Sequence, residues 1–372
     1  MRTSRLLGAA ALAASLLLIP PSLASAHPRP APTPSVELSG LGAPFNLEIK
    51  RSHVYFADGG LNLVGRVKSG GTFKTLAANQ AGASGVALSR NGKHLAFTTT
   101  ETNENTFENT ASGLNLWGPR GKRIYADTLA YEKAKNPDKI NFYGVRHPSQ
   151  CQVDALAGAG IPVGDYGQVD SHAYSVAAWA GGWVVADAGS NTLWWVNRKG
   201  KIKTMAVLPP QPTRITAAMA TSLGLDPCVA GITYNFEPVP TDVEVGRDGF
   251  LYVTTLPGGP EGPELGARGK VWRVNPFNGR ARAVASGFLG ATNLALGKHG
   301  EIYVAELFAG RISTVYCGRA KPYLTLPGVV AVETSSSGEL WAATLGNEDP
   351  PAPGTIVKIT KGKPHQQAKI RP

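Results

Sequence analysis

A strand–turn–strand pattern that recurs along the chain constrains the fold more than any other feature. In residues 241–253, TDVEVGRDGFLYV, alternating polar and apolar residues lead into an Arg-Asp-Gly turn and then an apolar, aromatic strand. Most of the recurring turns combine Gly with Asn, Asp or Ser, as tight hairpins require. The second strand of each copy carries an apolar triplet, at 54–56, 95–97, 183–185, 251–253, 302–304 and 340–342.

A third short strand follows each triplet, and a fourth follows it in five of the six copies. Four short antiparallel strands repeated at intervals of roughly 40 residues or more are typical of a β-propeller. Each unit buries its faces only against its neighbours, so the units must close into a ring. The sequence predicts an all-β fold over residues 36–360, a six-bladed β-propeller of four-stranded antiparallel blades.

The sixth copy lacks a clear fourth strand. Residues 36–49, VELSGLGAPFNLEI, resemble residues 283–296, AVASGFLGATNLAL, which join the fourth and fifth copies. We therefore expect residues 36–38 to supply the outer strand of the last blade, so that the N-terminal strand closes the ring. The alternative is an outer strand from residues 365–370.

The first 26 residues have the pattern of a secretory signal peptide. Arg2 and Arg5 form a basic start, an apolar run extends from residue 6 to about 19, and Ala-Ser-Ala at 24–26 fits a cleavage site. No later stretch is long and apolar enough to span a bilayer. We expect a secreted, extracellular protein that is monomeric and has no transmembrane segment.

The two ends of the remaining chain have the composition of flexible segments, and its balance of charge is basic. Residues 27–35 form a Pro-rich linker, and residues 361–372 form a basic C-terminal tail. The chain has 37 Lys and Arg against 26 Asp and Glu. Only two of the basic residues lie in the first 26, so cleavage of the signal peptide leaves the mature chain basic. Solubility explains this excess more simply than attraction to anionic wall polymers or lipids.

The connections between successive strands alternate between two sets, and all the long insertions belong to one set. The other set consists of tight turns only. In an antiparallel blade the two sets lie on opposite faces, so we expect one plain face and one loop-rich face. A small molecule, a cell-wall polymer or a protein could bind the loop-rich face. Nucleic acid is excluded, because no run interleaves Lys and Arg with aromatics. The insertions are residues 98–112, 128–172, 209–239, 254–268 and 344–353.

Three cysteines in an exported chain suggest one disulfide and one free thiol. Cys151 and Cys228 lie in the two longest insertions, which flank the third blade on the same face. We expect these two to form a disulfide. Cys317 ends a core strand, where we expect it to behave as a small buried hydrophobic residue.

Polar residues on the first strand of each blade face the predicted central channel. Asn46, Asp242 and Asn293 occupy equivalent positions on three strands, and Glu48, Glu244 and Glu333 lie two residues further along. Carboxylates and amides suit a divalent cation such as calcium, and Asp242, Asn293 and Glu244 are the candidate ligands. The simpler interpretation is that the three Glu pair with basic residues between blades.

The stretch DSHAYS at 170–175 enters the first strand of the third blade. We expect Asp170, His172 and Tyr174 to line the mouth of the channel. A His oriented by an Asp can act as a general base, although a capped turn explains the same residues. The chain lacks a G-x-S-x-G elbow, an H-E-x-x-H motif and a P-loop.

Three runs resemble secreted six-bladed propellers of the ScyD/ScyE family, named for the scytonemin pigment cluster. They are LAYEKAKNPD at 129–138, DSHAYSV at 170–176 with VADAGSNTLWWV at 185–196, and PTDVEVGRDGFLYVTTL at 240–256. In that family the Asn-Pro-Asp run leads almost directly into the Asp-Ser run, whereas here residues 142–169 intervene. The resemblance implies an exported propeller and no particular reaction.

The chain also resembles gluconolactonase- and strictosidine-synthase-like propellers of the wider NHL-type group. In those lactonases a divalent metal is held by an acid and by Asn and Asp at strand starts, which align here with Ala43, Tyr174 and Thr241. Asp242 and Asn293 lie one residue away, and that shift turns a side chain to the other face. We therefore expect a non-catalytic propeller that binds a ligand or partner, with a metal-dependent hydrolase or lactonase as the alternative.

Overall fold

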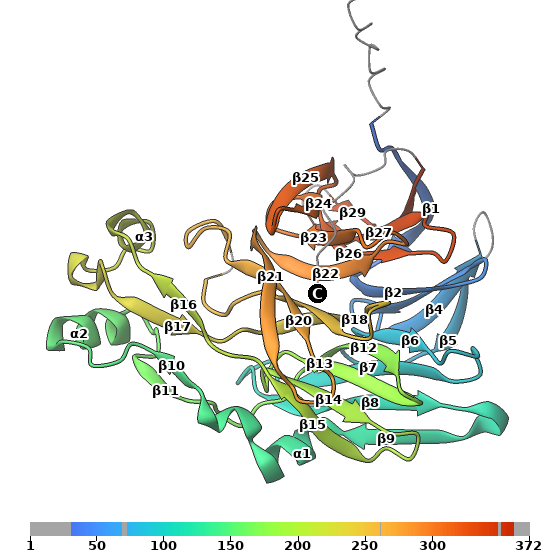
Figure 1. The fold of residues 1–372 in the computed structure, drawn as a ribbon, viewed down its shortest axis with the longest axis horizontal. Coiled ribbons are helices and arrows are strands. Elements are labelled where there is room, and N and C mark those ends of the chain that lie inside the picture. Colours follow the sequence, from blue (N-terminus) through green and yellow to red (C-terminus); the bar gives the residue numbers. More distant parts are fainter. Residues whose placement is uncertain (1–30, 69–72, 261, 349–350, 361–372) are drawn as a thin grey trace, which may run out of the picture.

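The computed structural model describes residues 31–68, 73–260, 262–348 and 351–360 (Figure 1). The predicted signal peptide, the basic tail and the alternative outer strand at 365–370 lie outside these residues. β-Strands dominate the described chain. None of its helices combines the length and apolar character needed to cross a bilayer.

Most strands belong to antiparallel four-stranded sheets in which each strand pairs with the next along the chain. Alternating residues and tight turns favour this arrangement, because each hairpin satisfies its own backbone hydrogen bonds. Three such sheets are β2 (Pro44–Lys50), β3 (His53–Asp58), β4 (Leu63–Lys68) and β5 (Phe73–Ala77); β6 (Val86–Leu88), β7 (Leu95–Thr102), β8 (Asn109–Trp117) and β9 (Arg123–Asp127); and β12 (Ala173–Trp179), β13 (Gly182–Asp187), β14 (Thr192–Val196) and β15 (Ile202–Val207).

The next eight strands form one continuous sheet. It consists of two antiparallel runs of four, joined by a single parallel bridge between Ser286 and Arg319. The runs are β18 (Pro240–Val245), β19 (Leu251–Thr255), β20 (Gly269–Val274) and β21 (Ala281–Phe288), and β22 (Ala291–Leu296), β23 (Ile302–Glu306), β24 (Arg311–Tyr316) and β25 (Arg319–Thr325).

The last sheet combines the two ends of the described chain. Strand β1 (Pro34–Leu41) pairs antiparallel with β30 (Gly354–Ile359), with Val36 opposite Val357. β30 pairs in turn with β27 (Leu340–Thr344), and β27 with β26 (Val329–Thr334). A two-stranded hairpin, β28 (Asn347–Glu348) and β29 (Pro351–Ala352), interrupts the approach to β30.

The sheets are arranged around a common centre (Figure 1). Their first strands, β2, β6, β12, β18, β22 and β26, each contact the next in that order, and β26 contacts β2. Apolar residues fill the space between neighbouring sheets; for example, Leu114 and Leu116 of β8 pack with Val176 of β12 and Trp194 of β14. This radial packing of antiparallel sheets defines a β-propeller.

Two of the predicted long insertions fold together into a lobe, which we define as residues 142–166 and 211–236. Its sheet has the order β11 (Gly164–Tyr166), β10 (Phe142–Gly144), β17 (Thr233–Phe236) and β16 (Gln211–Arg214). Helices α2 (Gln150–Gly158) and α3 (Ala217–Ser222) and the 3₁₀ turn η3 (Pro227–Val229) complete it, at the left of Figure 1. The lobe has its own apolar core, which includes Leu156, Val229 and Phe236.

Local capping sets the helices of both insertions. Ser149 and Gln152 form a capping box at the start of α2, which satisfies backbone N–H groups that the first turn leaves free. Between the propeller and the lobe, Asp127 caps α1 (Thr128–Lys135) by accepting from the Ala130 backbone N–H. Asn136 then adopts a left-handed conformation and caps the 3₁₀ turn η2 (Pro137–Ile140). A further 3₁₀ turn, η1 (Pro119–Gly121), connects β8 with β9.

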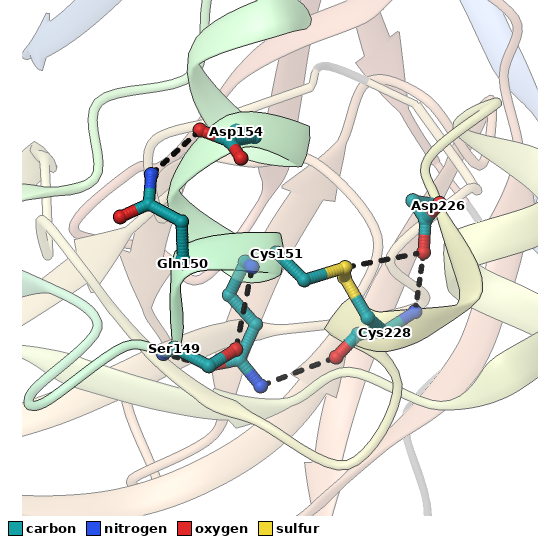
Figure 2. The surroundings of a disulfide bond; sticks show 7 residues. Ser149, Gln150, Cys151, Asp154, Asp226 and Cys228 are labelled. Carbon is teal, nitrogen blue, oxygen red and sulfur yellow. Dashed lines mark hydrogen bonds between the residues drawn. A yellow bond between two sulfur atoms is a disulfide. The ribbon is translucent and has the colours of Figure 1, made fainter.

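The predicted Cys151–Cys228 disulfide is confirmed. It joins α2 to η3 across the lobe, with an S–S distance of 2.14 Å and a Cα–Cα distance of 6.4 Å (Figure 2). Asp226 caps η3 by accepting from the Cys228 backbone N–H at 2.8 Å. The bond closes a loop of 77 residues, which contains the third sheet of the propeller.

The prediction for Cys317 is wrong. Cys317 lies in the tight turn between β24 and β25 and is exposed. It has a φ of 47°, because the chain reverses within Cys317 and Gly318. The apolar strand ends one residue earlier, so the thiol faces solvent rather than the core.

Candidate functional site

Asp242 on β18 sits at the centre of a network between the first strands of the sheets. Its carboxylate accepts from the Leu294 backbone N–H at 2.9 Å, from the Ser175 hydroxyl, and from Asn46 Nδ2 at 3.4 Å. The side chain is fully buried. Burial raises its pKa to about 6, although these hydrogen bonds oppose the shift. Asp242 therefore joins β18 to strands β12, β22 and β2.

The other two predicted polar residues make the same kind of connection. Asn46 Oδ1 accepts from the Val86 backbone N–H at 3.1 Å, which links β2 to β6. Asn293 Oδ1 accepts from the Val332 backbone N–H at 2.8 Å, which links β22 to β26. A first strand thus offers its side-chain oxygen to the backbone of the next.

Hydroxyl groups one residue earlier complete this pattern. Thr241 donates to the Ala291 carbonyl at 2.9 Å, and Thr292 donates to the Val330 carbonyl at 2.8 Å. Hydroxyl, carboxyl and amide side chains thus form hydrogen bonds with the backbone of the adjacent first strand. We call this set of hydrogen bonds the inner ladder. Sequence reasoning missed it, although the dipeptides Thr241-Asp242 and Thr292-Asn293 stand at the start of two first strands.

The residues predicted to bind a metal, Asp242, Asn293 and Glu244, make hydrogen bonds within the protein. The oxygens of Asp242 and the carbonyl oxygen of Asn293 already accept hydrogen bonds from neighbouring strands. Glu244 hydrogen-bonds Glu333. Among the described residues, three potential ligand groups cluster at Cys151, Asp226 and Cys228, and the two sulfurs there form the disulfide.

The three Glu of the channel are close enough to repel one another. Burial raises the pKa of Glu48 to about 7. Burial and the neighbouring carboxyls raise the pKa of Glu244 and Glu333 well above their ordinary value. The expected pairing with basic residues is not seen, because none of the ion pairs between described residues includes these Glu.

Aromatic rings cover the end of the channel near the insertions. Tyr174 contacts Phe45 and His172, at 5.8 and 5.5 Å between ring centroids. Burial lowers the pKa of His172, so this imidazole is neutral at neutral pH. Asp170 accepts from Asn109 Nδ2 at 2.9 Å and from the Ser171 backbone N–H at 2.8 Å. Both bonds are accepted by Oδ1 of Asp170, which joins this residue to β8 and to its own turn.

A cavity of about 440 Å³ lies within the lobe and reaches the loops at 258–260. This volume suits a small organic molecule. The walls are mostly apolar, with Leu156, Ile215 and Phe236 among them. Polar groups enter it from Asn235 and Glu237. Because sequence reasoning assigned no structure to these insertions, it named none of the cavity residues.

Glu237 is the cavity carboxyl with the clearest chemical potential. It immediately follows β17 and is half-buried. Burial, with additional repulsion from Asp138 and Asp170, raises its pKa to about 7, although a hydrogen bond from Asn191 opposes the shift. A carboxyl with this pKa can accept or donate a proton at neutral pH.

Further carboxyls lie close enough to Glu237 to influence it. Asp138 Oδ2 accepts from Tyr143 at 3.2 Å and from Asn191 Nδ2 at 3.0 Å, but its Oδ1 has no hydrogen-bond partner. Both oxygens of Glu132 on α1 also lack one, and both side chains are fully buried. Burial and neighbouring carboxyls raise the pKa of Glu132 to about 8, and burial raises that of Asp138 to about 6.

Asp187 on β13 ties this acidic group to the propeller. Its carboxylate accepts from Trp194 Nε1 at 2.8 Å, from the Ser171 hydroxyl at 2.6 Å and from the His172 backbone N–H at 2.8 Å. Two of the runs that resemble the ScyD/ScyE family therefore meet at one place. The residues that these two runs bring together are Glu132, Asp138, Asp170, His172, Asp187, Asn191 and Trp194.

No protein-family model and no curated protein sequence matches this chain. Solved structures do share its fold. A luciferin-regenerating enzyme has a TM-score of 0.52 at 11% identity, covering 91% of this chain and all of its own. A putative gluconolactonase has a TM-score of 0.51 at 11% identity, covering 90% of this chain and 94% of its own.

A protein of unknown function from Bacteroides thetaiotaomicron has a TM-score of 0.51 at 8% identity, covering 89% of this chain and 76% of its own. At these identities the similarity defines the fold alone. The chain is a β-propeller that carries a disulfide-linked lobe.

Proposed function

We propose that this protein is an enzyme of the gluconolactonase-like propeller class that acts on a small, largely apolar molecule in the lobe cavity. One observation carries the proposal. Glu237 reaches a cavity of about 440 Å³ with a pKa raised to about 7. A carboxyl in this state can serve as a general base for the attack of water on a lactone or ester.

The composition of the cavity indicates the class of substrate. Apolar side chains supply most of the wall, so binding depends on apolar area, while Asn235 and Glu237 offer a few polar contacts. The structural neighbours include a putative gluconolactonase and a luciferin-regenerating enzyme. Their names favour a catalytic function over a purely binding one.

Substitution of Glu237 tests the proposal. Purified protein is assayed against a panel of apolar lactones and esters, and Glu237→Gln is expected to lower kcat by about 100-fold or more. The wild-type rate is expected to rise with pH through about 7, because the base must lose its proton. Glu101→Gln, an exposed substitution on β7, is the matched control and leaves turnover unchanged.

Metal dependence needs a separate test, because the alternative predicted from sequence is a metal-dependent hydrolase or lactonase. The candidate ligands Asp242, Asn293 and Glu244 are committed to protein hydrogen bonds. We therefore expect turnover to survive treatment with EDTA and no stoichiometric calcium in the purified protein. Loss of turnover with EDTA, restored by a divalent cation, would contradict a metal-free reaction.

A non-catalytic propeller that binds a ligand or partner through its loop-rich face is the second candidate. The inner ladder favours it, because the channel residues predicted from sequence have structural duties. In this case the wild type binds an apolar fluorescent ligand in the lobe cavity but hydrolyses none of the panel. Glu237→Gln would then leave binding of the ligand almost unchanged.

We further propose that the propeller has six blades and that β1 closes its ring. Supporting this are the six sequence repeats, the circuit of contacts between first strands and the pairing of β1 with β30. The domain limits follow, with the propeller over residues 36–360 after a Pro-rich linker at 27–35. We also propose that the chain is related to the ScyD/ScyE family, on the resemblance of its three runs, two of which meet at the acidic group around Asp138.

Export is proposed from the pattern of residues 1–26. The Cys151–Cys228 disulfide fits an extracellular protein. Intact-mass analysis of protein recovered from the culture medium is expected to give a chain that begins at His27. Recovery of the uncleaved chain from the cell interior would contradict export.

A further inference from the structure

We propose that the face of the propeller made by its tight turns docks onto an anionic lipid bilayer. This turn face consists of the connections at 51–52, 89–94, 118–122, 179–182, 197–201, 246–250, 275–280 and 297–301. It lies opposite the insertions and shares no residue with the lobe cavity.

Contacts between neighbouring turns join those of the first three sheets into one surface. Lys50 Nζ donates to the Arg90 carbonyl at 3.0 Å, which joins the first two sheets. A cavity of about 220 Å³ between the next two is lined by Arg90, Trp179 and Arg198. Burial lowers the pKa of His94, and Arg198, Lys122 and Lys93 lower it further, so these cations gather around it.

The exposed charges of the turn face are predominantly positive. Its exposed carboxylate, Asp248, pairs with Arg273 at 2.9 Å, and Glu339 in the adjacent turn at 335–339 pairs with Lys358. The half-buried Glu301 accepts from the His299 backbone N–H at 2.8 Å. The exposed cations remain free to attract an external anion. They are Arg51, Arg90, Lys93, Arg120, Lys122, Arg198, Lys199, Lys201, Arg247, Arg280 and Lys298.

Acidic residues gather on the opposite side of the molecule. The exposed carboxylates of the insertions are Glu101, Glu104, Glu108, Asp154, Asp165 and Asp226. The insertions also carry exposed cations, so their charges nearly balance, whereas the turn face has a clear positive excess; those cations are Lys133, Lys135, Lys139, Arg146 and Arg214. The two faces therefore differ in charge, and this asymmetry turns the positive face toward a negative surface as the molecule approaches it.

An aromatic residue projects from the same face. Phe277 at the tip of the turn between β20 and β21 is 86% exposed. Its ring contacts Trp179, at 5.8 Å between centroids. Aromatic side chains surrounded by Lys and Arg are typical of proteins that lie on membranes, where the rings enter the headgroup region and the cations contact anionic lipid.

The shape of the face favours a bilayer over a flexible polymer or a nucleic acid. Its tight turns belong to several sheets, so the exposed cations are spread over the face rather than gathered in one cleft. A planar membrane can contact many of the exposed cations simultaneously, and each adds to the attraction. Composition alone explains the positive charge of the chain by solubility. Under this proposal, the positive charge of the turn face binds anionic lipid.

The test is sedimentation of the purified protein with lipid vesicles. Wild type is expected to bind vesicles that contain phosphatidylglycerol, to ignore pure phosphatidylcholine vesicles, and to be released by high salt. The triple variant Arg198→Glu, Lys199→Glu and Lys201→Glu is expected to weaken binding by about 100-fold. Phe277→Ser is expected to weaken it several-fold without changing its dependence on salt.

A matched triple variant separates the face from net charge. Lys133→Glu, Lys135→Glu and Lys139→Glu changes the same charge at exposed positions of α1 and η2. It is expected to bind nearly as well as wild type, and thermal melting verifies that both variants fold. Equal loss in both, absence of wild-type binding to anionic vesicles, or binding to soluble polyphosphate alone would overturn the proposal. Lactone turnover is unaffected in each variant.

Discussion

The central channel and the acidic group beside the lobe both bury carboxyl groups, but they differ in what those groups contact. In the channel, both oxygens of Asp242 accept hydrogen bonds from adjacent strands. Beside the lobe, Glu132 is equally buried and neither of its oxygens has a hydrogen-bond partner. Burial alone therefore does not separate structural carboxyls from chemically available ones.

The difference follows from how each region is built. First strands of similar sequence stand side by side around the channel, so a side chain at one position meets the backbone of the next strand. The acidic group is assembled from α1, η2 and the connections around β13, which have no common register. We expect removal of a channel group to affect stability and removal of a group at the lobe cavity to affect chemistry.

The largest effect is expected from the disulfide. Replacing Cys151 and Cys228 together by Ser should destabilise the lobe by about 4 kcal/mol, because the bond limits the freedom of a 77-residue loop in the unfolded chain. Hydrogen exchange should increase in α2 and η3 much more than in the first strands. Cys317→Ser is the control and should leave exchange unchanged. Uniform loss of protection would show that lobe and propeller unfold as one unit.

A slightly smaller effect is expected in the channel. Asp242→Ala should lower the free energy of unfolding by about 3 kcal/mol, because it leaves a buried backbone N–H and a buried hydroxyl without their acceptor. Urea unfolding measures the change. Asp248→Ala, which removes an exposed ion pair, should cost well under half as much. Wild-type stability with lost turnover would place the chemistry in the channel.

Glu132 should make stability depend on pH. Its folded pKa of about 8 lies above the ordinary 4.5, so the folded state keeps a proton that the unfolded chain loses between these values. Stability should therefore fall as pH rises through this window. Glu132→Gln should remove part of that fall and stabilise the protein at pH 8 by about 2 kcal/mol.

The channel provides the comparison for this titration. Glu48, with a pKa of about 7, should also lower stability as pH rises, and Glu48→Gln should remove its share. Thermal melting between pH 5 and 8 measures both variants. A pH profile unchanged by Glu132→Gln would show that Glu132 is charged in the folded protein and has a partner.

The smallest effect is expected from a single hydroxyl of the inner ladder. Thr292→Val should cost about 1 kcal/mol, because the Val330 carbonyl loses its donor while the side-chain volume stays almost the same. Thr221→Val in the exposed α3 is the control. An equal loss of unfolding free energy in the two variants would show that the inner ladder adds nothing beyond an ordinary threonine hydroxyl.

The propeller strands could be predicted from sequence because their determinants are local. Triplets such as 251–253 and turns such as Arg247–Gly249 specify a hairpin within a few residues, and period-2 alternation specifies which side is buried. The Cys151–Cys228 bond was predictable because strand order placed both insertions on one face. Local pattern misled at Cys317, where one residue separates a strand end from a turn, and at the three channel Glu, which form none of the ion pairs between described residues.

The site could not be predicted in the same way. Glu237 follows a short strand whose partners are distant in sequence, and nothing near it reveals the cavity. The duties of Asp242 and Asn293 depend on the backbone of the neighbouring strand, which a pattern within one strand does not contain. The runs at 129–138 and 185–196 did include Glu132, Asp138 and Asp187, but only the fold brings them together.

The pairing of β1 with β30 has a consequence for how the chain acquires its structure. Val36 and Val357 are direct partners, so the strand synthesised first must wait for the strand synthesised last. Contacts of such long sequence separation slow folding. Until β30 arrives, the edges of β1 and β27 offer unpaired backbone groups to other chains. The risk of misassembly is therefore highest before β30 has been synthesised.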